Sequence, residues 1–588
     1  MRRILILLCL LWSADAAFAS RIDTVFVTSD SVSLALSYYV PASAMPASGY
    51  PAILCVHGFG GSKADYDAVA TVYANAGYFV VAYTVRGEGI GAPAGNQSGG
   101  QFNWFTGDRE LQDVAEIIDW MRRLPDVDST RVGMEGASQG GLTTWGAIAK
   151  HVPVKCAVPI IAVPNYAETF TFNGCMNYAF VAAVNGAQQL GRVNLGKYIT
   201  DTIIPTISAD NYSSLTQLLG KRDLGAKIRS VNIPIFLQCS WYDQLFGTGA
   251  VLHAYDSIRT PKKLLIWAGD HSVPGGAIGD ERLALTLRFY NRWLRGDTTE
   301  NIMNPDSAVT FYETDNSSSF ATSNAQLHAN LEPQTFTKRY FFGPGGSLME
   351  QPQSQPLVAS SAYIQNLTND LTYYFTTPPL DSDRTFMNAG AYLQLGSSGL
   401  RYQANILLWD VDDTGHTVMF TRGASEVRTD KAGRATIAYR LNPVVHTIRK
   451  GHRLRASLKF GMPLLVSSDE FGQSAFAPQE SAFDTLFSQS QQYSYLVFSA
   501  FQLPDPAAVR PETVGVTQPT SSIVVLLGEP ILAASSETVL YDLRGVCVSH
   551  ADVNLLIPTE HLTPGLYFLR DRRSSGVVMR KVLILRDH

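Results

Sequence analysis

Residues 131–141 read RVGMEGASQGG, and this stretch decides how the rest of the chain is interpreted. Its first four residues have the short apolar pattern of a buried strand, and residues 142–150 after it have helical spacing. Between them lies Gly136-Ala137-Ser138-Gln139-Gly140, followed by Gly141. A strand, a glycine-rich turn and a helix in this order predict a sharp elbow that exposes Ser138 at the edge of a sheet.

The glycines on either side of Ser138 are part of this prediction. A Cβ atom at position 136 or 140 would clash in so tight a turn, and the turn leaves the serine strained and exposed. The backbone N–H of Gln139 begins the helix and would point to where an oxyanion forms on a reacting acyl carbon. We therefore expect Ser138 to be a nucleophile and Gln139 to supply one oxyanion donor.

Outward from the elbow, short apolar runs alternate with helical patterns over residues 50–300. The buried strands are expected at 52–56, 79–83, 131–134, 157–161, 235–239 and 263–267, with helical spacing between them as at 110–123. This alternation predicts an α/β fold with a mostly parallel sheet and helices on both faces. Residues 165–230 break the rhythm and predict a helical cap inserted between two core strands.

The second half of the chain has a different composition. Residues 301–505 show short alternating runs separated by Gly, Pro, Asp and Ser, which indicates a β-sandwich. Residues 506–522 are rich in Pro, Thr and Ser and are interpreted as a linker. The predicted division is a signal peptide at 1–19, a catalytic domain at 20–300, the sandwich, the linker, and a small β domain at 523–588.

Composition excludes several classes of protein. Of the 588 residues, 46% are hydrophobic and only 16% are charged, which excludes a disordered or coiled-coil chain. The formal net charge is −5, so the chain has no basic surplus and nucleic acid is not an expected partner.

The N-terminus predicts export. A short basic start at residues 1–3 precedes the apolar run ILILLCLLW at 4–12, and Ala17-Phe18-Ala19 offers small residues for cleavage after Ala19. The apolar run is too short to span a bilayer. Among the remaining cysteines, Cys55 and Cys239 are expected to be buried thiols, whereas pairing of Cys156 with Cys175 stays open.

A serine nucleophile needs a base, and the base needs a carboxylate that orients it. Asp243 follows the strand at 235–239 and His271 follows the strand at 263–267, so both should lie at the same sheet edge as Ser138. His253 and His151 are weaker candidates for the base because each lies in or at the end of a helical pattern. Asp270 is the rival acid, but its side chain should project in a different direction from that of His271.

The loop His57-Gly58-Phe59-Gly60-Gly61 follows the first strong strand and can supply the second oxyanion N–H, from Phe59. We expect His57 to orient this loop. Arg86-Gly87-Glu88-Gly89 could bind substrate or could make a structural salt bridge, and the sequence leaves both open. No metal-ligand cluster or dinucleotide motif occurs in the sequence, so we expect no cofactor.

At these residues the chain resembles the α/β-hydrolase group of X-prolyl dipeptidyl peptidases and cocaine-esterase-like (CocE/NonD) enzymes. The elbow, Trp241-Tyr242-Asp243 and residues 289–296 carry the resemblance in the first half. In the second half it is carried by 391–395, 408–412, 421–423 and 450–454, which are similar to the jelly-roll C-terminal domain of the same enzymes. The resemblance implies a β jelly roll that borders the active site and is itself non-catalytic.

The chain departs from that group at the oxyanion site. The group usually has Tyr after the nucleophile, where this chain has Gln139, and its cocaine-esterase-like members use a tyrosine hydroxyl as a donor. The tail resembles a type IX secretion sorting domain in residues 539–545, 562–570 and 580–584. This second resemblance implies the type IX machinery as a partner, and secretion or attachment at the outer-membrane surface.

The sequence thus predicts a secreted serine hydrolase that acts on peptide or ester acyl bonds and resembles a dipeptidyl peptidase. A carboxylesterase or amino-acid-ester acylase is the first alternative. The second alternative is an inactive carbohydrate- or surface-binding protein. The oligomeric state stays open.

Overall fold

The computed structural model describes residues 19–165, 167–209, 211–314, 322–328, 336–363, 372–428, 433–460, 482–489 and 492–500, and seven strands between 522 and 585. The chain divides into two compact units, Met1–Phe501 and Gln502–His588. The predicted signal peptide and linker lie outside the described residues except for Ala19 and Ser522.

A parallel sheet forms the centre of the first unit, as the strand–helix alternation predicts. Its six expected strands are β3 (Tyr50–Val56), β4 (Phe79–Tyr83), β5 (Val127–Ala137), β6 (Cys156–Ile160), β7 (Ile235–Ser240) and β8 (Lys262–Trp267). They lie in the order β4-β3-β5-β6-β7-β8 and all run parallel. The antiparallel pair β1 (Ser20–Val27) and β2 (Ser33–Val40) extends the β4 edge. The carboxyl ends of β3, β5, β7 and β8 therefore meet at one edge.

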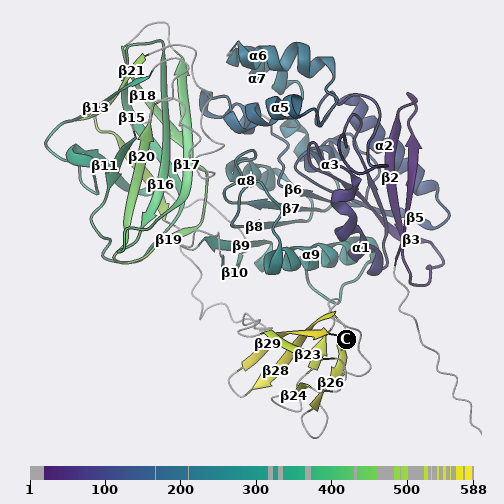
Figure 1. The fold of residues 1–588 in the computed structure, drawn as a ribbon. Coiled ribbons are helices and arrows are strands. Elements are labelled where there is room, and N and C mark those ends of the chain that lie inside the picture. Colours follow the sequence, from purple (N-terminus) through teal and green to yellow (C-terminus); the bar gives the residue numbers. More distant parts are fainter. Residues whose placement is uncertain are drawn as a thin grey trace, which may run out of the picture. The chain divides into compact units, whose positions relative to one another are not determined.

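Helices cover the two faces of this sheet (Figure 1). They are α1 (Asp67–Asn75), α2 (Asp108–Arg123), α3 (Gln139–Ala149), α8 (Thr248–Ser257) and α9 (Gly276–Tyr290). Helix α2 shows why they form, because five of its apolar residues recur at helical spacing and are buried: Leu111, Val114, Ile117, Ile118 and Met121. None of the described helices is both long and apolar enough to cross a membrane.

The cap consists of short helices between β6 and β7. They are α4 (Ala167–Phe170), η2 (Phe172–Gly174), α5 (Tyr178–Leu190), η3 (Ile199–Ile203), α6 (Ile204–Ser208), α7 (Tyr212–Gly220) and η4 (Gly225–Ser230). Figure 1 shows α5, α6 and α7 grouped above one side of the sheet. The predicted cap insertion is confirmed.

The central sheet continues past residue 300, where the sequence analysis begins the sandwich. Strand β9 (Val309–Thr314) pairs parallel with β8, and β10 (Thr322–His328) pairs antiparallel with β9. The predicted boundary therefore falls before the end of the sheet. The prediction was wrong because the composition changes before β9, whereas β9 still pairs with the edge strand β8 of the central sheet.

The β-rich region spans β11 (Phe336–Gly343) to β22 (Tyr495–Ala500) and forms two sets of antiparallel strands (Figure 1). One set contains β11-β22-β15-β18, in which β15 spans Arg384–Ser397 and β18 spans Gly433–Arg440. The other contains β14-β20-β16-β17, which span Tyr373–Thr376, Arg453–Lys459, Arg401–Val411 and Thr417–Arg428. Strands β12 (Ser347–Met349), β13 (Leu357–Tyr363), β19 (His446–Ile448) and β21 (Ala482–Ser488) complete the region.

The second unit is a small β domain. Strands β23 (Ser522–Leu526), β29 (Gly576–Leu585), β28 (Gly565–Arg573), β25 (Val539–Tyr541) and β26 (Cys547–His550) form one sheet in that order. Strands β24 (Ile531–Leu532) and β27 (Leu556–Ile557) form a separate pair. The predicted small C-terminal β fold is confirmed.

Arg86, which follows β4, makes a buried ion pair with Asp113 of α2. Its guanidinium bonds both oxygens of Asp113, with Nε–Oδ2 at 2.7 Å and Nη2–Oδ1 at 2.5 Å. It also reaches Asp30 at 3.1 Å, and this contact lowers the pKa of the Asp30 carboxyl to about 2. Of the two roles that the sequence leaves open for this arginine, the structure shows the salt bridge.

We predict that Arg86→Met strongly destabilises the part of the chain that is built on the parallel sheet. The change leaves the Asp113 charge buried without its partner, which costs about 3–5 kcal/mol of unfolding free energy. Urea unfolding followed by tryptophan fluorescence measures the loss. Arg109 is the matched control, because it lies 3.7 Å from Asp30 but is exposed. Arg109→Met should cost about 1 kcal/mol or less. Equal losses in the two variants would contradict the structural role of Arg86.

Candidate active site

Ser138 stands at a strained turn between β5 and α3. Its backbone has φ 55° and ψ −116°, a left-handed conformation that side chains rarely adopt. A Cβ added at Gly136 would lie 2.3 Å from the carbonyl carbon of Gly140, and one added at Gly140 would lie 1.9 Å from the Val56 oxygen. The two glycines therefore let the chain turn tightly enough to present the serine side chain at the sheet edge.

Three side chains that are distant in sequence form one hydrogen-bonded row. His271 Nε2 lies 2.8 Å from Ser138 Oγ, and His271 Nδ1 lies 2.9 Å from both carboxylate oxygens of Asp243. Asp243 is fully buried, while the His271 side chain is 12% exposed. The structure thus brings together the predicted nucleophile, base and acid. The imidazole is placed to accept the serine proton while the carboxylate fixes the other ring nitrogen.

The rival residues lie elsewhere. The exposed Asp270 carboxylate accepts a hydrogen bond from the Ser272 hydroxyl at 2.5 Å and does not take part in the row. His253 is exposed on α8, and His151 is exposed after α3. Neither histidine has a contact with Ser138 among the hydrogen bonds of the described residues.

Both the cap and the sandwich hold the loop that carries Asp243. Within the loop, Asp243 Oδ1 accepts hydrogen bonds from the backbone N–H groups of Leu245 and Phe246, at 2.8 and 2.7 Å. From the cap, the Asn177 amide donates to the Gln244 carbonyl at 3.1 Å. From β17 of the sandwich, the buried Arg422 donates to the Tyr242 carbonyl at 2.9 Å. The sequence analysis missed Asn177 and Arg422, since no local pattern links them to this loop.

The first candidate oxyanion donor is the N–H of Gln139. This residue opens α3, and the first N–H groups of a helix have no partner within the helix. This N–H group also lies at the positive end of the helix dipole. Its place directly after Ser138 is therefore suited to stabilising negative charge beside the nucleophile.

The direction of the second candidate donor, the Phe59 N–H, is set by the peptide group that joins Gly58 to Phe59. The Gly58 carbonyl accepts hydrogen bonds from His57 Nδ1 at 2.7 Å and from Gly61 N–H at 3.1 Å. In a trans peptide the C=O and N–H point in opposite directions, so the Phe59 N–H points away from His57. A Cβ added at Gly58 would lie 3.7 Å from the Ser138 Cβ, which places this peptide next to the serine.

His57 is a neutral side chain that fixes this loop. The Val85 backbone N–H donates to its Nε2 at 2.9 Å, so the ring proton resides on Nδ1 and is donated to Gly58. Burial lowers the pKa of this histidine, which keeps it neutral. The orienting role expected for His57 agrees with these contacts.

The other nucleophilic and metal-binding groups do not compete with this row. Cys55, Cys156 and Cys239 are buried free thiols, so the pairing of Cys156 with Cys175 that the sequence leaves open is not formed here. Burial raises the pKa of Cys55 and of Cys239, which disfavours the reactive thiolate. Within the described ranges, no group of three or more His, Cys, Asp or Glu side chains could hold a metal ion.

Known sequences are similar to the first half of the chain. The family model of the X-Pro dipeptidyl-peptidase (S15 family) matches residues 30–273. A Bacillus subtilis (strain 168) protein named "Putative esterase YitV" is 28% identical over 125 residues, which cover 20% of this chain and 48% of that protein. An uncharacterised 31.7 kDa protein of Escherichia coli is 27% identical over 130 residues, covering 22% of this chain and 42% of its own. The chain thus spans less than half the length of these relatives.

Solved structures match both the hydrolase and the β-rich region. A CocE/NonD family hydrolase from Staphylococcus aureus has a TM-score of 0.64 at 13% identity, covering 82% of this chain and 93% of its own. An α-amino acid ester hydrolase has a TM-score of 0.63 at 16% identity, covering 83% and 97%. An aminopeptidase from a marine sediment Thaumarchaeota archaeon has a TM-score of 0.61 at 14% identity, with the same coverage. At these identities the likeness shows the shared fold.

We predict that His57→Leu lowers the turnover number toward an ester substrate by about 100-fold or more, because the Phe59 N–H loses its orientation. The Michaelis constant should change far less, since ground-state contacts remain. His253→Leu, which alters an exposed histidine, is the control and should retain full turnover. A His57→Leu enzyme that folds and turns over within threefold of the unaltered protein would contradict this role.

The family match, the shared two-part fold and the hydrogen-bonded row agree with one another. The match covers the elbow and ends beyond His271, so it includes all three members of the row. The chain has the fold of the CocE/NonD enzymes, and its residues 30–273 match the X-Pro dipeptidyl-peptidase (S15) family.

Proposed function

We propose that this protein is a serine hydrolase that cleaves peptide or ester acyl bonds through an acyl-enzyme at Ser138, in the manner of a dipeptidyl peptidase. One observation carries the proposal, namely the unbroken row from Asp243 through His271 to Ser138, with both links at 2.8–2.9 Å. Such a row converts a weak hydroxyl nucleophile into a strong one, because the proton leaves as the bond to carbon forms.

In the first half-reaction, His271 Nε2 takes the proton of Ser138 as Oγ attacks the acyl carbon. The carbonyl oxygen becomes an oxyanion and accepts hydrogen bonds from the N–H groups of Gln139 and Phe59. Asp243 stabilises the imidazolium that forms. The intermediate collapses, the bond to the leaving group breaks, and His271 returns the proton to that amine or alcohol.

In the second half-reaction, water replaces the leaving group. His271 takes a proton from water as its oxygen attacks the acyl-enzyme, and the same N–H groups hold the second oxyanion. Collapse of this intermediate breaks the bond to Ser138 Oγ, which takes the proton back from the imidazolium and leaves a carboxylic acid product. Apart from the substrate and one water molecule, these steps use only groups of the chain.

Aromatic side chains around the row support an apolar acyl group. Phe59 contacts Phe102 and Phe105 with ring centroids 5.2 and 5.3 Å apart, and Phe246 lies 5.4 Å from the His271 ring. Further ring contacts join these two ends through Trp104, Phe180 and Phe170, the last two from the cap. An apolar wall of this kind binds hydrophobic acyl groups, proline among them, better than charged ones.

Ester hydrolysis is the closest alternative activity. It is favoured by the name of the Bacillus subtilis relative and by the ordinary-hydrolase oxyanion loop at residues 57–61, which provides a backbone donor. The same acyl-enzyme chemistry serves both bonds. The two activities differ in whether the leaving group is an amine or an alcohol.

The proposal is tested by labelling with a fluorophosphonate beside turnover assays. The unaltered protein should be labelled once per chain, and Ser138→Ala should lose both labelling and turnover. Parallel assays with an Xaa-Pro p-nitroanilide and short p-nitrophenyl esters separate the two activities, since a peptidase turns over both. Ester turnover alone would favour the esterase, and unlabelled, inactive protein would contradict the proposal.

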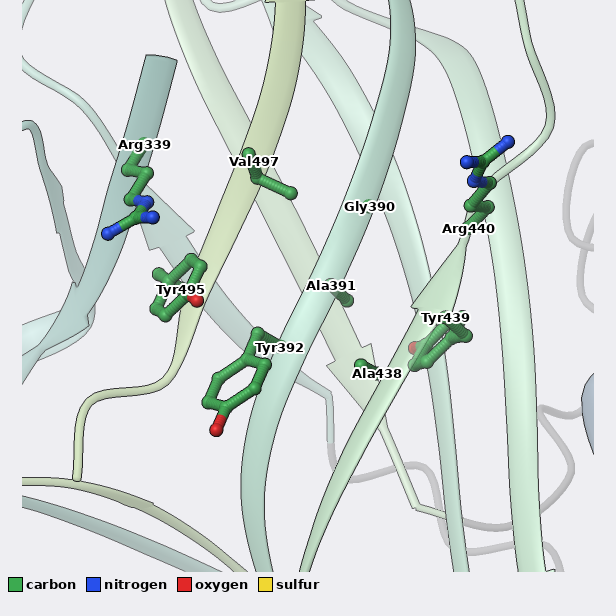
Figure 2. Close-up of a pocket in the computed structure, with 9 residues that line it drawn as sticks. All are labelled: Arg339, Gly390, Ala391, Tyr392, Ala438, Tyr439, Arg440, Tyr495 and Val497. Carbon is green, nitrogen blue, oxygen red and sulfur yellow. The ribbon is translucent and has the colours of Figure 1, made fainter. Parts of the chain in front are cut away.

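Carbohydrate binding by the sandwich is a second candidate function. A pocket of about 320 Å³ is lined in part by Tyr392 of β15, Tyr495 of β22 and Arg339. Figure 2 shows the two tyrosine side chains side by side, with Arg339 near Tyr495. The two tyrosine rings are stacked, with centroids 4.9 Å apart, and the Arg339 guanidinium lies 5.0 Å from the Tyr495 ring. Retention on a glycan array that survives Ser138→Ala but not Tyr392→Ala would support this function.

We also propose that the protein is exported and carried across the outer membrane by type IX machinery. The basis is the tripartite N-terminal segment and the three tail blocks, which overlap β25, β28 and β29. Fractionation of cells that express the full chain and a version lacking residues 523–588 tests this localisation, and only the full chain should reach the surface or the medium.

A further inference from the structure

A buried carboxyl, that of Glu88, contacts the oxyanion loop at residues 57–61. Glu88 belongs to the turn after β4 and its side chain has no exposed surface. Its backbone is fixed on both sides, because its N–H donates to the Val85 carbonyl at 3.1 Å and its carbonyl accepts from Ser98 N–H at 3.0 Å. The carboxyl oxygen Oε2 accepts a hydrogen bond from the Gly60 N–H at 3.0 Å. Glu88 therefore holds the loop one residue beyond Phe59.

The same carboxyl faces the elbow. The side-chain amide of Gln139, which is only 1% exposed, interacts with it. Glu88 Oε1 and both polar atoms of the Gln139 amide lack a hydrogen-bond partner among the described residues. Buried polar atoms are costly when unpaired, so carboxyl and amide are left to satisfy each other, directly or through a bound water.

We propose that Glu88 is a positioning residue of the oxyanion site, whose carboxyl ties the Phe59 loop to the elbow by bonding Gly60 N–H and the Gln139 amide. This inference rests on the proposed serine-hydrolase function. The two donor N–H groups come from separate segments of chain, residues 57–61 and 138–139. A single side chain that contacts both segments fixes the distance between the donors, and preorganised donors are what stabilise an oxyanion.

The charge state of Glu88 suits this task. Burial raises the pKa of its carboxyl well above the ordinary value and outweighs the Gln139 amide and the Gly60 N–H, which lower it. His57 Nδ1, 3.7 Å away, belongs to a neutral ring whose proton is donated to Gly58. The raised pKa favours the protonated carboxyl, which can accept from Gly60 with one oxygen and bond the Gln139 amide with the other.

Glutamine is the matched replacement for a neutral glutamic acid. The amide oxygen of Glu88→Gln can accept from Gly60, and its NH₂ group can donate to Gln139. Glu88→Ala removes both bonds. The comparison of these two variants therefore separates loss of the tie from loss of a charge.

The test measures turnover of a p-nitrophenyl ester per active site, with the active sites counted by fluorophosphonate titration. We expect Glu88→Ala to lower kcat by about 10- to 100-fold, somewhat less than removal of a whole donor. Its Michaelis constant should stay within about twofold. The affinity of phenylboronic acid, which forms a tetrahedral adduct on the serine, should fall by the same factor as kcat/KM. Glu88→Gln should stay within about threefold of the unaltered enzyme in every measurement.

Glu135→Ala is the control for a general loss of stability. Glu135 is also a buried carboxyl of the sheet, but it bonds the hydroxyls of Tyr73 and Tyr290, at 2.7 and 3.2 Å. Its removal should lower the melting temperature and leave kcat per active site unchanged. If Glu88→Ala fails to fold, Gln139→Met decides, because it keeps the carboxyl and removes its partner, and it should lower kcat severalfold.

Three results would overturn the inference. They are a folded Glu88→Ala enzyme with unchanged kcat, a Glu135→Ala enzyme with the same loss per active site, and an unchanged boronate affinity. Failure of the proposed function is distinguishable, since it appears as unaltered protein that is neither labelled nor active. Failure of the inference alone appears as labelled, active protein that tolerates the loss of Glu88.

Discussion

The left-handed backbone of Ser138 is the constraint on which the rest of the site depends. At φ 55° and ψ −116° the residue turns the chain from β5 into α3 within a single position. That turn lifts the hydroxyl to the sheet edge and leaves the following N–H at the start of a helix. It exists only because positions 136 and 140 carry no Cβ, which would otherwise meet backbone atoms at 2.3 and 1.9 Å. Strain of this kind persists where the surrounding packing over-determines the conformation.

The partners of Ser138 are held by every part of the first unit. The loop of Asp243 is bonded by Asn177 of the cap and by Arg422 of the sandwich, in addition to its own N–H groups. The β-rich region thus touches the acid-bearing loop without supplying a residue of the row. The cap and sandwich also touch each other, since Asn173 donates to the Ala424 carbonyl at 3.1 Å. A change in either region can therefore alter the position of the acid.

The sequence was most informative where the determinants are local. The elbow depends on glycines within five residues of one another, and the order of Asp243 and His271 follows from strands that each end in the same direction. The contacts of Arg422 with Tyr242 and of Glu88 with Gly60 join residues 180 and 28 positions apart, and neither pair shows a pattern in the chain. The sequence analysis placed β9 in the sandwich, because the pairing of β9 with β8 is visible only in the folded sheet. The aromatic contacts that run from Phe59 through residues 102–105 to the cap were likewise beyond prediction.

The central claim is that Ser138 carries the acyl group during turnover. Intact-mass and peptide-mass analysis after quenching with a slowly deacylating ester tests it most directly. Cleavage after Arg131 and Lys150 releases a peptide whose only serine is Ser138. The account predicts one acyl group per chain on that peptide, appearing within the first turnover and disappearing as the product is released. An acyl group on another peptide, or full turnover with no covalent species at any time, would contradict it.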